Sequence, residues 1–225
     1  MIKNFFKQLR WRRVAGQLRK PAGKEGMEIA RKMNAANEFL YDFTLDEMLI
    51  RDNQTLLEIG FGNGKFFSRQ FDRAANLRIT GIDYSPEMIK AARSENEEWI
   101  KKGHLTLIRG ESDRMPFNEA SFDSVFSINV TYFWDYPQDH LLEIHRVLKP
   151  GGRFYTTIRT PESLATLPFS SFGFRMYTVD DWKLLCHLNH LTFIRCAQVT
   201  EPPVAGKGPA EGLKSVCLVA EKKIL

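Results

Sequence analysis

The sequence lacks any long apolar run and contains little cysteine. No stretch of the 225 residues approaches the roughly 20 apolar residues that a membrane-spanning helix needs, so we expect no such helix. The three cysteines, Cys186, Cys196 and Cys217, are too few and too scattered for a disulfide framework. Both features favour a protein of the reducing cytoplasm.

Metal-ligand patterns are also missing. No Cys/His spacing resembles a metal site, and His187 and His190 have no nearby acid that would complete a ligand set. We therefore expect no metal. The composition, with 43% hydrophobic and 26% charged residues, is ordinary for a globular chain and argues against a mainly disordered one.

Positive charge is concentrated at the start of the chain. Residues 1–33, the basic arm, contain ten Lys/Arg against two Glu and carry a net charge of +8. The rest of the chain carries −3, which gives the overall net charge of +5. A nucleic-acid surface over the whole protein is therefore not indicated. Apolar residues recur at helical spacing within the arm: Ile2, Phe5, Phe6, Leu9 and Trp11. We favour packing of this helix on its own domain; contact with an anionic membrane surface and, least favoured, with nucleic acid stay open.

The rest of the sequence alternates helix and strand patterns. Helices are predicted at residues 27–40, from a cap at Thr44 through Ile50, and at 179–190. Strands are predicted at 55–59, 78–82, 105–109, 124–129, 152–158, 192–199 and 214–220, the last two joined by a loop rich in proline and glycine. This order predicts an α/β domain at residues 51–225, preceded by the arm and a helical cap at 1–50. The sheet should be doubly wound and mostly parallel, with helices on both faces and a ligand beyond the carboxyl ends of the strands.

The most informative stretch is the turn after the first predicted strand. It reads Leu-Leu-Glu-Ile-Gly-Phe-Gly-Asn-Gly and places Glu58, Gly60, Gly62 and Gly64 at alternate positions. Glycine adopts positive φ and lets a ligand come against the main chain. A dinucleotide fingerprint needs its third glycine five residues after the first, where this chain has Lys65. A nicotinamide-dependent oxidoreductase is therefore disfavoured.

A second motif follows 19 residues after the last of these glycines. The segment Gly-Ile-Asp-Tyr-Ser-Pro places Asp83 at the end of the second predicted strand. A carboxylate there can accept hydrogen bonds from both hydroxyls of a ribose. Asp83 could instead serve only the turn into the next helix, which Ser85 and Pro86 fit as cap and first residue. Its spacing from the glycine turn favours the ribose role.

The glycine turn and Asp83 together resemble the first motifs of class I S-adenosylmethionine-dependent methyltransferases, of the small-molecule type called methyltransferase type 11. Two later segments are similar to further motifs: Arg-Gly-Glu-Ser-Asp-Arg-Met-Pro-Phe at 109–117 and Leu-Glu-Ile-His-Arg-Val-Leu-Lys-Pro-Gly-Gly at 142–152. The resemblance is firm over about residues 52–160. It implies a Rossmann-like, seven-stranded sheet with an antiparallel last strand, the cofactor S-adenosyl-L-methionine and the product S-adenosyl-L-homocysteine.

The resemblance also implies where the cofactor binds. In similar enzymes, residues that match Tyr84 and Met88 lie against adenine, although Met88 could be an ordinary core residue. Glu111 stands where the family usually has an aspartate that recognises the adenine edge, so Asp113 is an alternative contact. Asn129 stands at the methionine end. The implied cofactor residues are Glu58, Gly60, Phe61, Gly62, Gly64, Asp83, Tyr84, Met88, Glu111, Ser112 and Asn129.

The acceptor pocket is less defined. A methyl group on a sulfonium is already activated, so the enzyme must align the reactants and exclude water, and we assign no catalytic residue. Candidates come from the helical cap, the aromatic residues after the fourth strand and a predicted substrate-site insertion at 161–177. They are Asn34, Asn37, Tyr41, Tyr132, Phe133, Trp134, Arg159, Phe169, Phe172, Phe174, Arg175 and Tyr177, each with an alternative in core or surface packing. Arg159 and Arg175 are also candidates to hold an acceptor carboxylate or phosphate.

We therefore expect a methyltransferase that acts by direct displacement on a small, partly aromatic or lipid-like acceptor. A non-catalytic module that binds the cofactor or a partner is the main alternative, because methyl transfer demands few diagnostic side chains. The sequence indicates neither the acceptor atom nor the oligomeric state.

Overall fold

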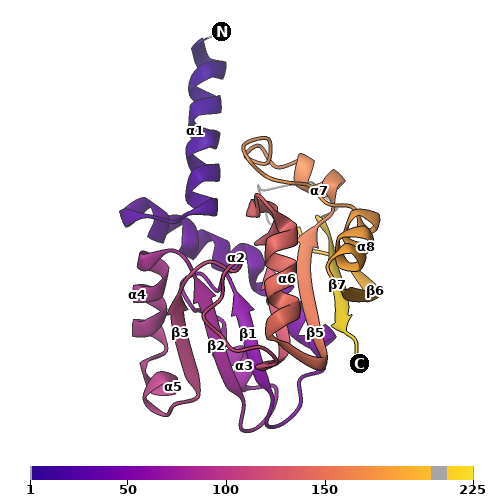
Figure 1. The fold of residues 1–225 in the computed structure, drawn as a ribbon. Helices are drawn as coiled ribbons and strands as arrows, with labels where there is room; N and C mark the ends of the chain where they lie inside the picture. Colours follow the sequence, from indigo (N-terminus) through magenta and orange to yellow (C-terminus); the bar gives the residue numbers. More distant parts are fainter. Residues whose placement is uncertain (1, 204–211, 225) are drawn as a thin grey trace.

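The computed structural model contains a seven-stranded sheet with the order β3-β2-β1-β4-β5-β7-β6 (Figure 1). It describes residues 2–203 and 212–224 and, in the first helix, side chains from Phe6 onward. The strands are β1 Thr55–Ile59, β2 Arg78–Asp83, β3 Leu105–Arg109, β4 Phe122–Ile128, β5 Leu148–Arg159, β6 Leu191–Thr200 and β7 Lys214–Lys222. Strands β1 to β5 pair in parallel, and β7 is antiparallel to both β5 and β6. The predicted mostly parallel sheet with an antiparallel last strand is confirmed.

Helices connect these strands and cover both faces of the sheet. They are α1 Ile2–Arg19, α2 Gly23–Met48, α3 Phe67–Phe71, α4 Pro86–Glu95, α5 Glu97–Lys101, α6 Pro137–Val147, α7 Pro161–Ala165 and α8 Val179–Leu188, with a short 3-10 helix η1 at Thr131–Phe133. Most of the loop predicted between the last two strands falls on 204–211, outside the described residues. Within the described ranges, no helix has both the length and the apolar character needed to cross a bilayer.

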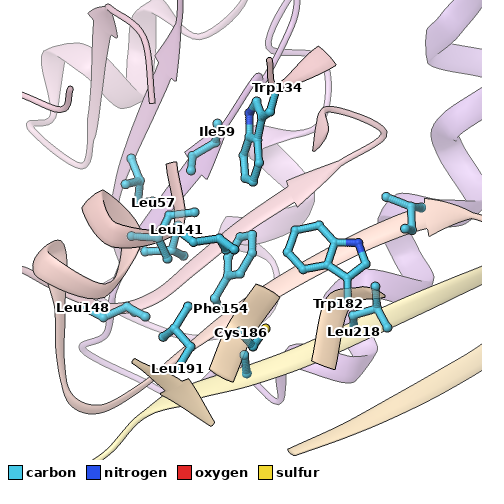
Figure 2. Packing of buried hydrophobic residues seen from close by; sticks show 14 of the residues in the cluster. Leu57, Ile59, Trp134, Leu141, Leu148, Phe154, Trp182, Cys186, Leu191 and Leu218 are labelled. Carbon is cyan, nitrogen blue, oxygen red and sulfur yellow. The ribbon is translucent and has the colours of Figure 1, made fainter. Parts of the chain in front are cut away.

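The two faces of the sheet bury separate apolar cores. Neighbouring side chains of a strand point to opposite faces, so Leu56 belongs to the core covered by α2, α3 and α4, and Leu57 to the core covered by α6 and α8. In the second core, Phe154 of β5 lies between Leu141 of α6 and Trp182 of α8 (Figure 2). This packing fixes the parallel strands, and with them the loops that begin at their carboxyl ends.

One helix replaces two that the sequence predicted. We expected a break at Thr44, but α2 runs without interruption from Gly23 to Met48. The Thr44 hydroxyl donates to the carbonyl of Leu40 at 2.6 Å, one helical turn earlier, so it is satisfied inside the helix and does not act as a cap. Leu49, in the left-handed conformation at φ 49°, ends the helix. The prediction of two helices was therefore wrong, and a single long helix crosses the sheet.

Two segments project at the end of the domain where the parallel strands terminate. Helix α1 extends away from the body there, and α7 with its following loop lies at the same end (Figure 1). Ligands of open α/β sheets bind at this edge. The fold thus places the basic arm and the predicted insertion beside the expected site.

Candidate active site

A cavity of about 540 Å³ opens at the carboxyl ends of the parallel strands. Its wall is built from the turn after β1, the ends of β2 and β4, the segment after β3, the helix α2 and the junction between α1 and α2. Both its position and its size are typical of a site for a small organic ligand.

The three glycines of the turn have different neighbours. A Cβ atom at Gly60 would lie 2.5 Å from Val130 Cγ2, and one at Gly64 would lie 2.6 Å from Ala92 Cβ. Gly62 has φ +59°, lines the cavity, and no described atom comes within 4 Å of the place where its Cβ would stand. Close packing therefore explains Gly60 and Gly64, whereas Gly62 leaves open main chain at the cavity wall.

Asp83 joins the end of β2 to this turn. Its Oδ2 atom accepts a hydrogen bond from the N–H of Gly62 at 3.0 Å, and its Oδ1 atom accepts one from the N–H of Ser85 at 2.9 Å. Burial raises the pKa of Asp83 to about 6, although these N–H donors favour the ionised form. A carboxylate has about four lone-pair sites, so Asp83 can still accept hydrogen bonds from a ligand in the cavity.

Glu58 lies beneath the turn and outside the cavity lining. The Tyr41 hydroxyl donates to one carboxylate oxygen, and the side-chain amide of Gln70 donates to the other. The carboxyl is 2% exposed, and burial raises the pKa of Glu58 to about 7. Glu58 therefore ties α2 to β1, and Tyr41 is the member of this group that reaches the cavity.

The cavity next to Asp83 is bordered by the predicted adenine contacts Tyr84, Met88, Glu111 and Ser112. The Ser112 hydroxyl lies 2.8 Å from Nδ1 of His140, a residue that the sequence analysis missed. The only local signal for it was a lone histidine three residues after Pro137, a residue type that suits the first turn of a helix.

The ring of His140 stacks on Trp134, with centroids 4.4 Å apart and planes 7° from parallel. Burial lowers the pKa of His140 to about 4, so it is neutral near pH 7. His140 and Trp134 both line the cavity and together form a flat aromatic wall beside Ser112.

A chain of polar side chains forms the opposite end of the cavity. Asn129, at φ 57°, donates from Nδ2 to Oδ1 of Asn37 at 3.0 Å. The Tyr132 hydroxyl donates to Oδ1 of Asn129 at 2.9 Å and accepts the N–H of Arg159 at 2.5 Å. Burial also raises the pKa of Tyr132, so this phenol keeps its proton. Tyr132 therefore orients its neighbours and is not a base at neutral pH.

Arg159 lines the cavity, but its charge is already matched. Its Nε and Nη2 atoms donate to the two carboxylate oxygens of Glu201, both at 2.8 Å, and the two side chains are 7% and 8% exposed. Such a bidentate buried pair leaves no free cation for an acceptor. The hypothesis that Arg159 anchors an acceptor anion does not fit this geometry.

Only part of the predicted insertion at 161–177 reaches the cavity. Of the candidate acceptor residues, the cavity is lined by Asn34, Asn37, Tyr41, Tyr132, Phe133, Trp134, Phe169 and Phe174, whereas Phe172, Arg175 and Tyr177 lie outside its described lining. Tyr177 instead packs on Trp182 in the core, with ring centroids 5.5 Å apart. The main chain of Arg175 donates to the carbonyl of Tyr132 at 2.9 Å, which fixes the insertion against η1.

The junction between α1 and α2 closes the cavity from above, which the sequence analysis did not foresee. The Tyr84 hydroxyl donates to the carbonyl of Arg19, and the Ser85 hydroxyl donates to the carbonyl of Pro21 at 2.8 Å. The Arg19 guanidinium pairs with Asp135 on the other side of the opening. These contacts join the basic arm to both rims of the cavity.

Comparisons with known proteins match this chain to methyltransferases. Residues 57–156 match the model of a family described as "Methyltransferase domain". "Uncharacterized methyltransferase YdaC" of Bacillus subtilis is 29% identical over 151 residues, which is 67% of this chain and 81% of that protein. "Ubiquinone/menaquinone biosynthesis C-methyltransferase UbiE" of Paracoccus denitrificans is 34% identical over 110 residues, 48% of this chain and 44% of that protein. The chain thus spans less than half the length of UbiE in this match.

Solved structures share the fold at low sequence identity. The methyltransferase in complex with the Haloferax volcanii Trm112 methyltransferase activator has a TM-score of 0.75 and 21% identity, over 87% of this chain and 94% of that chain. A second structure is geranyl diphosphate C-methyltransferase from Streptomyces coelicolor in complex with Mg²⁺, geranyl diphosphate and S-adenosyl-L-homocysteine. It has a TM-score of 0.67 and 17% identity, over 90% of this chain and 87% of that chain.

Proposed function

Since the chain belongs to the family of S-adenosylmethionine-dependent methyltransferases, we propose that it transfers the methyl group of S-adenosyl-L-methionine to a small, lipid-like acceptor. The observation that carries this proposal is the pairing of Gly62 with Asp83. Gly62 leaves open main chain at the cavity wall, and the Asp83 carboxylate stands beside it with lone pairs to spare. A ribose on Asp83 would bring the rest of the cofactor against Gly62.

The charges around the cavity also fit this cofactor, whose sulfonium and ammonium groups are cationic. The acids Asp83, Glu111 and Asp113 border the cavity, whereas the two arginines of its lining are paired, Arg19 with Asp135 and Arg159 with Glu201. The surroundings therefore favour a cationic ligand over a dinucleotide, whose phosphates need N–H donors or free cations.

The cofactor supplies an activated methyl group, so this chain's residues have to bind, orient and exclude water. Asp83 would hold the ribose, Tyr84, Met88, Glu111 and Ser112 would border the adenine, and Asn129 with Asn37 would lie at the methionine end. The junction between α1 and α2 would cover the cofactor.

The cavity supplies no evident general base among its described residues. The Tyr132 hydroxyl is engaged on both sides, and His140 is neutral but bound to Ser112 beside the predicted adenine contacts. An acceptor that is acidic or carries a stabilised carbanion needs only alignment, and such an acceptor suits this site.

The remaining wall of the cavity is apolar, which supports a lipid-like acceptor. It is formed by Ile29, Met33, Phe133, Leu164, Phe169 and Phe174. An anionic group deep in this region would find no unpaired cation among the described side chains, because Arg159 is bound to Glu201. UbiE, named for ubiquinone and menaquinone biosynthesis, is a relative whose name supports the same class of acceptor.

Incubation with radiolabelled S-adenosylmethionine and cell extract tests this proposal. We expect label in the organic-soluble fraction, and much less of it at limiting cofactor concentration when the Asp83→Asn variant replaces the wild type. Label confined to RNA or protein would reject the lipid-like acceptor. Tight cofactor binding without transfer to any fraction would favour the non-catalytic module.

A further inference from the structure

Helix α1 carries apolar side chains on different sides in its two halves. In the second half, Ala15 is 3% exposed and Leu18 lines the cavity, so this side faces the domain. Phe6 and Leu9 precede them by nine residues each, which is about 2.5 turns and therefore the opposite side of the helix. Phe6 is 64% exposed and Leu9 is 47% exposed. On this second side Leu9 borders a groove between α1 and α2 that Ile29 also lines, so packing on α2 covers part of it and leaves much of Leu9 and Phe6 exposed.

Cations surround these exposed apolar residues. Lys7, Arg10 and Arg12 are exposed, and none of them forms an ion pair within the described part of the chain. The arm as a whole carries +8, whereas the rest of the chain carries −3. A helix that presents apolar side chains among Lys and Arg fits the interface of a bilayer with anionic headgroups.

The same half of α1 lies beside the opening of the cavity. Trp11 contacts Phe169, with ring centroids 6.4 Å apart, and Phe169 is part of the apolar cavity wall. Helix α1 and the α7 loop project at the same end of the domain (Figure 1). A surface that binds the projecting half of α1 would therefore lie at the end of the domain where the cavity opens.

We infer that residues 6–13 of α1, the docking segment, bind the surface of an anionic phospholipid bilayer and turn the cavity opening toward it. A nucleic acid fits less well, because exposed Phe6 and Leu9 gain nothing from a phosphate backbone and the remaining chain is acidic. An apolar acceptor dissolved in the bilayer then reaches the cavity without crossing water. This delivery rests on the proposed function, but the docking itself does not.

Sedimentation of the full chain with lipid vesicles tests the docking. We expect binding to vesicles of phosphatidylcholine with phosphatidylglycerol, weakening with added salt, and little binding to phosphatidylcholine alone. Reversal of three arm charges, Lys7→Glu, Arg10→Glu and Arg12→Glu, should weaken binding at least about 100-fold. The matched control reverses three exposed charges elsewhere, Arg51→Glu, Lys90→Glu and Arg93→Glu, and should retain most of the binding.

Two further measurements make the outcome unambiguous. Leu9→Ser should weaken vesicle binding with the charge unchanged, and circular dichroism should show all variants folded. Absence of wild-type binding to anionic vesicles, equal loss in the arm and control variants, or binding to an RNA oligonucleotide in place of vesicles would overturn the inference. Titration with S-adenosylhomocysteine without vesicles tests the proposed function separately, since the docking segment takes no part in it.

Discussion

The carboxylate of Asp83 accepts a hydrogen bond from the main-chain N–H of Gly62 across 3.0 Å. This bond links the end of β2 to the cavity-facing glycine of the turn after β1. The two groups that a ribose and its attached chain would meet are thereby held in one rigid unit before any ligand binds. Preorganisation of this kind lowers the entropic cost of binding.

Removal of the charge on Asp83 should abolish most cofactor affinity. In Asp83→Asn, the amide cannot accept hydrogen bonds with both atoms, so S-adenosylhomocysteine should bind about 10-fold to 100-fold more weakly. Isothermal titration calorimetry measures this change. The control Asp72→Asn, at an exposed position after α3, should bind like wild type. Equal affinity of Asp83→Asn and wild type would show that Asp83 serves only the turn.

A methyl group at Gly62 should harm binding more than folding. Gly62 and Gly103 have φ of +59° and +74°, and neither position has a described atom within 4 Å of an added Cβ. Alanine at either position should therefore cost about 1–2 kcal/mol of unfolding free energy, from the left-handed backbone alone. Only Gly62→Ala should weaken S-adenosylhomocysteine binding, because Gly103 lies outside the cavity lining. Denaturant unfolding and calorimetry together separate these effects; similar affinities in both variants would contradict the account.

Cofactor affinity should fall at acid pH. Burial raises the pKa of Asp83 to about 6 and that of Glu58 to about 7 in the free protein. Ribose hydroxyls and a cationic ligand favour ionised carboxylates. Above about pH 7 both acids are mainly ionised and can therefore support cofactor binding. Well below pH 6, where Asp83 is protonated, affinity should decrease by about tenfold per pH unit.

Titrations of wild type and Asp83→Asn with S-adenosylhomocysteine between about pH 5 and pH 8 identify the carboxylates responsible. The variant should lose the steep dependence near pH 6 and keep any dependence that arises from Glu58. A wild-type affinity that stays constant between about pH 5 and pH 8 would mean that neither carboxylate has to ionise for binding.

Loss of the Tyr132 hydroxyl should destabilise the protein. Tyr132→Phe leaves Oδ1 of Asn129 and the N–H of Arg159 without this buried partner, at a cost of about 1–3 kcal/mol. Tyr136 is 65% exposed, so Tyr136→Phe should stay within about 0.5 kcal/mol of wild type. Chemical denaturation of both variants checks this difference. An unchanged unfolding free energy in Tyr132→Phe would show that the polar end of the cavity does not depend on this hydroxyl.

Local pattern was enough to predict the strands and the glycine turn. Runs of apolar residues mark the buried parallel strands, and the spacing from Gly64 to Asp83 follows from a strand-turn-helix-strand unit of fixed size. Such features depend on neighbours in sequence.

The features that the sequence could not provide depend on distant residues. By residue type alone, Arg159 was a reasonable candidate to bind an anion. The fold places Glu201, 42 residues later in the chain, against its guanidinium. Similarly, His140 became part of the cavity only because α6 places it beside Ser112, 28 residues earlier. Thr44 is a good helix cap by type, yet tertiary packing of α2 outweighed that preference.

A calorimetric titration of the wild-type protein with S-adenosylhomocysteine, with NADH as the comparison ligand, measures whether the cavity is a methyl-donor site. We expect one-to-one binding of S-adenosylhomocysteine with a micromolar dissociation constant and no binding of NADH. Saturable binding of NADH, or no detectable binding of S-adenosylhomocysteine by the folded protein, would contradict this expectation.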